Sequence, residues 1–279
     1  MSKELAEIAE FWEKIKRNPK RFFHSDDELT YYQIANFAVA YLKGLEYVSG
    51  ILYNSKMDYW FDAKFNMLSD FAWWTWAKMK CKYDMVKSTK LILREMVLFM
   101  KAENRLNWSV PESVMSLNAL CSEENLQKTA QKRYDQLIHT LSWIDKNPRT
   151  FILYAFKAGE PKLSLDNIPD IHENIFFYIS GLLYGMSHFS VCNYLEQYEE
   201  WVFTKYSIED RTMSWQKIYT DILYHSDKRH AARMAVKDLL LFFTEEVKSI
   251  CGMNLPVFIV TKVEKGMNLP IYIVSTVKK

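Results

Sequence analysis

The sequence predicts an all-α protein in which two related four-helix repeats pack together and a C-terminal β-hairpin follows them. Three observations lead to this fold class. The chain has only seven Gly and seven Pro in 279 residues, which favours long helices over many turns. Segments of the first half reappear, in the same order, in the second half. The last residues repeat a run of β-branched and aromatic side chains, which is typical of strands.

Three pairs of similar segments define the internal repeat. They are 15–23 (IKRNPKRFF) with 144–152 (IDKNPRTFI), 41–47 (YLKGLEY) with 178–184 (YISGLLY), and 91–100 (LILREMVLFM) with 234–243 (MAVKDLLLFF). Chance gives one such match easily, but three in the same order are much rarer. We therefore expect residues 3–104 to superpose on residues 123–249, with Gly44 over Gly181.

Each repeat is predicted to contain four helices. The expected ranges are 3–17, 27–53, 57–80 and 85–104 in the first copy, and 123–146, 168–188, 190–206 and 214–249 in the second. Asn18-Pro19 ends the first helix, because the residue before a proline is pushed out of helical geometry. Ser25 and Glu28 fit a capping box at the start of the next helix. The last helix is expected to break near 225–230.

The segment 174–195 carries no formal charge, and its length suits a membrane span. Its counterpart in the first copy contains a lysine and a glutamate, and the segment itself contains several polar side chains. Such groups are costly in hydrocarbon unless they are paired. Gly181 and Gly185 share one helix face and permit close approach of another helix. We therefore expect a buried helix of a soluble bundle, with a break near Ser187, and no membrane span.

The end of the chain is a tandem duplication. GMNLPVFIVTKVEK at 252–265 is followed directly by GMNLPIYIVSTVKK at 266–279. Each copy is expected to supply one strand of a hairpin over 251–279, and the second copy is expected to be dispensable. The body of two repeats then covers 1–250, with a linker at 105–122.

Composition and charge indicate an ordinary cytoplasmic protein. Hydrophobic residues make up 49% and charged residues 25%, and a net charge of +2 demands no nucleic-acid partner. The four cysteines lie far apart, without a CxxC pair, which favours reduced thiols. The N-terminal segment lacks the apolar core of a signal peptide.

No P-loop, GxGxxG, GxSxG or HExxH motif is present, and we predict no enzyme activity, no cofactor and no metal. His188 and Cys192 share a helix face and could form half of a metal site, but a second pair at ligand spacing is missing. We therefore favour a buried cysteine beside a hydrogen-bonded histidine. The tripeptide HSD occurs at 24–26 and at 225–227, where capping of a helix is the simpler interpretation.

The segment 166–174 gathers acidic residues ahead of the uncharged helix. Asp166 and Asp170 could bind a cation, although acidic residues also suit the first turn of a helix. With His172 and Glu173 they are the first residues to consider for catalysis.

Aromatic side chains crowd the segment 58–80 and cover more than one helix face. At least one of Trp73, Trp74 and Trp76 must point away from the main core. Packing between the repeats is the simpler interpretation, and an exposed anchor for a partner protein is the alternative.

The richness in lysine, tyrosine and asparagine, together with the degenerate tandem tail, resembles the helical immunity proteins of bacterial polymorphic-toxin systems. The resemblance is one of general character and covers residues 1–250. It implies a cytoplasmic protein that neutralises a cognate toxin by direct binding, with a nuclease as one candidate toxin and with neither nucleic acid nor membrane as a partner. A helical-repeat scaffold and an enzyme with a site among the helices, using Asp170, His172, Glu173 and His188, are the alternatives.

The two copies differ in charge. Residues 76–105 contain eight basic and three acidic residues, whereas residues 193–210 contain five acidic residues and one basic residue. Both runs could be solvated helix faces. A toxin that acts on nucleic acid has a basic cleft, however, and an acidic surface complements it. The predicted partner-binding residues are Glu196, Glu199, Glu200, Tyr198, Trp201, Glu209 and Asp210.

Overall fold

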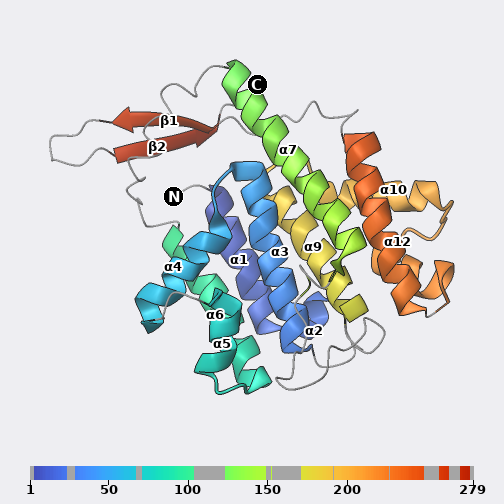
Figure 1. The fold of residues 1–279 in the computed structure, drawn as a ribbon, viewed down its shortest axis with the longest axis horizontal. Helices are drawn as coiled ribbons and strands as arrows, with labels where there is room; N and C mark the ends of the chain where they lie inside the picture. The colour runs from blue at the N-terminus through green and yellow to red at the C-terminus, as the bar shows by residue number, and fades with distance from the viewer. Residues whose placement is uncertain are drawn as a thin grey trace.

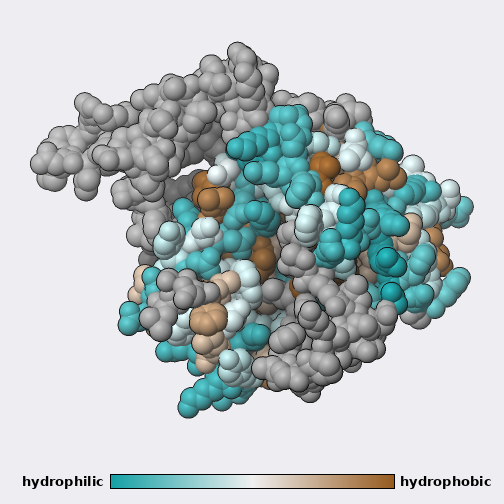
Figure 2. Space-filling model, viewed as in Figure 1, coloured by the Kyte–Doolittle hydropathy of each residue, from teal (hydrophilic) through white to brown (hydrophobic). Residues whose placement is uncertain are grey.

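The computed structural model of the protein describes residues 3–23, 29–66, 71–103, 123–148, 152, 171–190, 192–225, 227–247, 258–263 and 271–276. Most of these residues are helical, which confirms the predicted all-α character (Figure 1). On the face shown in Figure 2, hydrophilic residues cover most of the described surface, and the apolar patches between them are small and separate.

The first half contains α1 (Lys3–Arg17), α2 (Pro19–Phe22), α3 (Tyr31–Ser49), α4 (Tyr53–Phe65), α5 (Trp73–Lys80) and α6 (Met85–Glu103). α6 packs against α1, α3 and α5. α4 joins the group through its contacts with α3 and α5. The predicted helices over 3–17 and 85–104 are confirmed by α1 and α6.

The second half contains α7 (Glu123–Lys146), α9 (Ile171–Phe189), α10 (Tyr194–Lys205), α11 (Trp215–Lys217), the π-helix η3 (Ile218–Leu223), α12 (Lys228–Leu241) and the π-helix η4 (Phe242–Val247). α12 packs against α7, α9 and η3, while α10 contacts α9 and α11. The predicted helix over 123–146 is confirmed, and so is the break near 225–230, because η3 and α12 are separate helices.

α3 and α9 form the centre of the molecule and lie side by side (Figure 1). A methyl group on Gly181 would overlap the Phe37 carbonyl, and one on Gly185 would overlap the Tyr41 carbonyl. Gly44 lies equally close to the backbone of α9. Both contact pairs advance by four residues in the same sense, so the two helices run in the same direction. The close approach predicted for Gly181 and Gly185 is confirmed.

The uncharged segment 174–195 forms most of α9 and the start of α10. The break predicted near Ser187 is found just after it, between the end of α9 at Phe189 and the start of α10 at Tyr194. Its side chains are largely buried against α3, α10 and α12. Within the described part of the chain, no helix has both the length and the apolar character needed to cross a bilayer.

Two hydrophobic cores flank this central pair. One consists of side chains from α1, α3, α4, α5 and α6, and the other of side chains from α7, α9, α10, α12 and the π-helices. α3 supplies Ala40, Tyr47 and Val48 to the second core, and α9 packs Phe177 and Tyr184 against the first. The two halves are therefore joined along α3 and α9.

The predicted helix over 27–53 starts later than expected. α3 begins after Thr30, whose hydroxyl accepts from the Gln33 backbone N–H at 3.3 Å while the Gln33 side chain accepts from Thr30 N–H at 2.7 Å. This is the capping box of the helix. Ser25 and Glu28, to which we assigned that role, lie outside the described residues. α3 ends at Gly50, which has the left-handed conformation that glycine favours.

The prediction of a single helix over 57–80 is wrong, because α4 and α5 are separate. α4 ends at Asn66, whose φ of 55° is left-handed, a conformation that asparagine tolerates better than most residues. α5 starts at Trp73, whose backbone N–H donates to the Asp58 carboxylate at 2.8 Å. A hydrogen bond between distant residues thus fixes the second start.

Near the C-terminus, β1 (Phe258–Val263) and β2 (Ile271–Thr276) pair antiparallel, with Val260 opposite Val274. Each strand comes from one copy of the tandem duplication. The connection predicted between them, and the linker predicted at 105–122, lie outside the described residues.

Candidate functional site

α10 carries most of the predicted partner-binding residues. Asn193 caps it by accepting from the Glu196 backbone N–H at 3.4 Å. Tyr194, Tyr198 and Val202 recur every four residues and are buried. This spacing places them on one helix face, so Glu196 and Glu200 lie toward solvent while Glu199 is partly buried.

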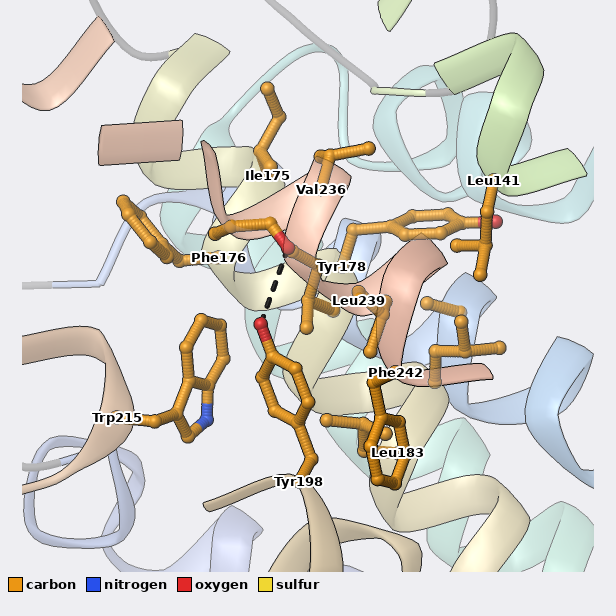
Figure 3. Packing of buried hydrophobic residues seen from close by; sticks show 14 of the residues in the cluster. Leu141, Ile175, Phe176, Tyr178, Leu183, Tyr198, Trp215, Val236, Leu239 and Phe242 are labelled. Atoms are coloured by element: carbon orange, nitrogen blue, oxygen red, sulfur yellow. Dashed lines mark hydrogen bonds between the residues drawn. The ribbon is translucent and has the colours of Figure 1, made fainter. Parts of the chain in front are cut away.

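Tyr198 is fully buried, and its assignment as a surface anchor for a partner is therefore wrong. Its ring points into the second core between Trp215 and Phe242 (Figure 3). Its hydroxyl donates to the Ala235 carbonyl at 3.2 Å. A tyrosine whose ring and hydroxyl are both satisfied inside the protein has nothing to offer a partner.

The remaining predicted residues lie on α10 and on the loop after it. Glu196, Glu200, Glu209 and Asp210 are exposed. Glu200 forms a surface ion pair with Arg211 at 2.8 Å, which contributes little because both side chains are solvated. We call these four residues, together with Glu199 and Trp201, the acidic face.

Two carboxylates of the acidic face are fixed by their surroundings. Burial, and then the Glu196 carboxylate, raise the pKa of Glu199, while a hydrogen bond from the Trp215 backbone opposes this shift. Asp210 accepts from the Thr212 hydroxyl at 2.6 Å and from its backbone N–H at 2.9 Å, which lowers the pKa of Asp210. Asp210 therefore keeps its negative charge and orders the loop after α10.

Trp201 lies half-buried within the acidic face and is held from two sides. Its ring stacks on Tyr198 at an interplanar angle of 17°, and the Lys205 ammonium lies 4.6 Å from the centre of a ring of Trp201. Lys205 is itself ion-paired with Asp238 at 2.6 Å. Trp201 therefore has a fixed position and loses little conformational freedom on binding.

Asp238 and Glu95 are buried carboxylates, one in each half. Asp238 accepts from Lys205, and also from the Tyr206 and Tyr219 hydroxyls at 2.5 Å each. Partners of Glu95 are the Lys64 ammonium at 2.6 Å, the Trp60 indole N–H at 3.0 Å and the Arg94 guanidinium at 2.9 Å. Because these donors occupy the carboxylate oxygens, both sites support the fold and are poorly suited to acid–base chemistry.

His188 lies on α9 where the two halves meet. Its Nδ1 is 2.6 Å from the Tyr41 hydroxyl, and its ring packs edge-on against Phe11. Burial lowers the pKa of His188 to about 4, so the ring is neutral near pH 7. Cys192 lies beyond the end of α9 and is partly buried, so the prediction that it shares a helix face with His188 is wrong. Among the residues that the structure describes, no group of three or more His, Cys, Asp or Glu is placed to hold a metal ion.

The other motifs lie at helix ends. Asp227 caps α12 by accepting from the His230 backbone N–H at 3.0 Å, which confirms the capping interpretation for 225–227. Glu173 accepts from Gln33 at 3.1 Å and also contacts Lys228, so it joins α3 to α12. His172 lies half-buried on α9. Asp166, Asp170 and the 24–26 motif lie outside the described residues.

The aromatic segment belongs mainly to the first core. Trp73 is fully buried, and Trp74 and Trp76 are half-buried against that core, in agreement with the expectation that not all three lie inside. Sequence reasoning missed a different exposed group. Met79, Tyr83, Met85 and Val86 project at the turn between α5 and α6. The predicted boundaries at 80 and 85 locate this turn, but they do not reveal that its apolar side chains are exposed.

Searches against protein-family models, curated proteins and solved structures find no match for this chain.

Proposed function

We propose that the protein is a cytoplasmic, protein-binding inhibitor, and specifically an immunity protein that neutralises a cognate bacterial toxin by direct contact. The acidic face carries this proposal. Glu196 and Glu200 are exposed one turn apart on α10, and the exposed Glu209 and Asp210 lie on the loop after it, next in sequence to Arg211, which pairs with Glu200. A surface of one sign attracts a partner surface of the opposite sign and orients its approach.

A toxin that cleaves nucleic acid has a basic substrate cleft, because it must hold phosphates. Carboxylates presented on a helix can occupy the positions of those phosphates and block the cleft. Part of the acidic face is already ordered without a partner, because Thr212 holds the Asp210 carboxylate in place. This order favours a role in blocking the cleft.

Charge mainly speeds association and sets orientation, while aromatic side chains supply much of the affinity at interfaces. With Tyr198 inside the core, Trp201 is the aromatic residue of the acidic face that remains partly accessible. Its contacts with Tyr198 and Lys205 hold the ring in place. We therefore assign the anchor role to Trp201.

Capture of the partner from the native cell tests the proposal. The wild-type chain should retain one stable partner, and a Glu196→Lys, Glu200→Lys, Glu209→Lys variant should retain little of it. Glu199 is left unchanged, because its carboxylate accepts from the Trp215 backbone and its loss would disturb α11.

The matched control makes the same change of charge elsewhere, as Glu10→Lys, Asp62→Lys, Asp135→Lys on exposed positions of α1, α4 and α7. It should capture the partner as the wild type does. Equal capture by all three chains would show that the acidic face is not the interface. Many weakly bound proteins in place of one partner would favour a scaffold.

We further propose that the two halves, 3–104 and 123–249, descend from one duplicated unit. The buried carboxylates support this proposal. Glu95 of α6 binds Lys64 at the end of α4, and Asp238 of α12 binds Lys205 at the end of α10. In both halves the lysine ammonium also lies over a tryptophan one turn earlier in its own helix.

The boundaries of the helices give independent support. α4 and α10 are each followed by a left-handed residue, Asn66 with a φ of 55° and Ser207 with a φ of 53°. α6 and α12 are each capped by an aspartate, Asp84 and Asp227, which accepts from the backbone N–H three residues on. Such details are not expected from shared helical composition alone.

The C-terminal segment 251–279 is proposed to be a separate, peripheral β-hairpin. A two-stranded hairpin is marginally stable by itself in water, so it needs support from the helices or from another chain. The near-identity of the two tandem copies, 252–265 and 266–279, supports a late duplication at the end of the chain, with a dispensable second copy.

A further inference from the structure

The turn between α5 and α6 exposes four large apolar side chains within a short stretch of chain. The exposed fractions are 37% for Met79, 64% for Tyr83, 38% for Met85 and 59% for Val86. We call these four residues the apolar corner. Single exposed apolar residues are ordinary, but a group of them marks a surface that another molecule covers.

The backbone holds this corner in an unfavourable conformation. Lys82 has a φ of 53° and Tyr83 a φ of 63°, so two successive residues other than glycine are left-handed. The Tyr83 backbone N–H donates to the Lys78 carbonyl at 2.8 Å, which closes α5 around them. Such strain concentrates at functional sites, because selection otherwise removes it with a glycine.

Lysines flank the apolar corner along the chain. Lys80, Lys82, Lys87 and Lys90 are exposed, and of these Lys87 pairs with Asp84 at 3.1 Å. An apolar centre with a charged rim is the usual composition of a protein–protein interface. The rim requires an acidic surface opposite it.

The same chain carries such a surface. The acidic face carries four exposed carboxylates and the half-buried Trp201, and the apolar corner carries four exposed lysines beside its apolar residues in the chain. α5 and α10 lie on opposite sides of the molecule, so the two surfaces cannot meet within one chain (Figure 1). We propose that the apolar corner of one copy binds the acidic face of a second copy.

A contact between two different surfaces repeats head to tail, and it gives a ring if the rotation closes or an open chain if it does not. The association should therefore grow with protein concentration. It should weaken at least about tenfold between 50 mM and 500 mM salt, because exposed charges are screened over a Debye length.

Two charge-reversed variants test the contact by sedimentation of the purified full-length chain. The corner variant carries Lys80→Glu, Lys82→Glu, Lys90→Glu, and the face variant carries Glu196→Lys, Glu200→Lys, Glu209→Lys. Each alone brings like charges together and should remain monomeric. A mixture of the two should associate, because each restores opposite charges to the other.

A control variant with Lys132→Glu, Lys146→Glu, Lys237→Glu, at exposed positions of α7 and α12, should associate as the wild type does. Tyr83→Ser, Val86→Ser should weaken association without changing charge. Circular dichroism of each variant establishes that it is folded before its mass is interpreted.

A wild-type chain that stays monomeric at low salt and high concentration would overturn the proposal, and so would a mixture that fails to associate. Binding of the monomeric wild type, but not of the corner variant, to phosphatidylserine vesicles would assign the corner to a membrane surface and also overturn it. Since no toxin is present in these experiments, their failure leaves the proposed function untouched.

Discussion

The two halves of the molecule have similar interiors and opposite surfaces. Glu95 and Asp238 are both buried, and each is bonded to a lysine from a neighbouring helix. Outside these sites, the turn between α5 and α6 is rimmed by lysines, while α10 is lined by glutamates. A buried carboxylate tolerates little change, because an unpaired charge inside a protein is costly. Surface residues are free of that constraint, so partner recognition is expected where the halves differ.

The largest effect is expected at the contact that joins the halves. Gly44→Leu and Gly185→Leu each force a side chain into the backbone of the opposite helix, and each should lower the free energy of unfolding by about 3 kcal/mol or more. Lys132→Leu, on the exposed side of α7, is the control and should be nearly neutral.

Urea unfolding followed by circular dichroism measures these losses. Both variants should unfold in a single transition, because α3 and α9 supply side chains to both cores. Two separate transitions would mean that the two halves fold independently and are separate domains.

The next largest effect is expected on the pH dependence of stability, through a histidine that lies on α9. α9 places His188 at the junction of the halves, and its pKa is lowered by burial from 6.5 to about 4. The unfolded chain therefore binds a proton between these pH values while the folded chain does not. Stability should fall as the pH drops from 6.5 toward 4, by about 3 kcal/mol, and then level off.

Unfolding measured at several pH values gives the slope of stability against pH. The His188→Gln variant should lack the decrease in stability between pH 6.5 and 4. The exposed His139 serves as the control, because His139→Gln should leave the slope unchanged. If the wild type and the His188→Gln variant lose stability in parallel, His188 is not the titrating group.

A smaller loss of stability is expected when the lysine that pairs with either buried carboxylate is replaced, and the loss should differ between the two sites. Lys64→Met and Lys205→Met each remove a cation from a buried carboxylate and should cost about 1–3 kcal/mol. The loss should be greater for Lys205→Met, because Glu95 keeps the Arg94 guanidinium while Asp238 keeps only neutral tyrosine donors among its hydrogen-bond partners described here. Equal losses would mean that the Arg94 contact, which is half exposed, adds nothing.

The smallest effect is expected at the C-terminus. Deleting 266–279 should leave the helical signal in circular dichroism almost unchanged if the hairpin is peripheral to the helices, as we propose. A decrease larger than the share of the deleted residues would show that the second tandem copy supports the helical body.

Sequence reasoning succeeded where local signals are strong. α1, α6 and α7 follow from helical patterning and from the punctuation at Asn18-Pro19, and the close approach at Gly181 and Gly185 follows from their spacing. The separation of α4 from α5 was missed, since Asn66 ends a helix without glycine or proline and the next start depends on a distant aspartate.

Within the candidate site, the same limits apply. The acidic run on α10 could be a solvated helix face or a partner-binding surface, and Glu196 and Glu200 are exposed there while Glu199 is partly buried. Tyr198 was misassigned although its spacing from Tyr194 and Val202 marks it as part of the buried stripe. The apolar corner was missed because its exposure depends on how α5 and α6 pack, which no local pattern reveals.

The most direct test of the proposed function is the association rate between this protein and the partner isolated with it, which we propose to be a toxin, measured at several salt concentrations. The Glu196→Lys, Glu200→Lys, Glu209→Lys variant should associate at least about tenfold more slowly than the wild type at low salt, with a much weaker salt dependence. The Glu10→Lys, Asp62→Lys, Asp135→Lys control should match the wild type. An unchanged rate for the first variant at low salt would contradict the assignment of the acidic face as the partner-binding surface.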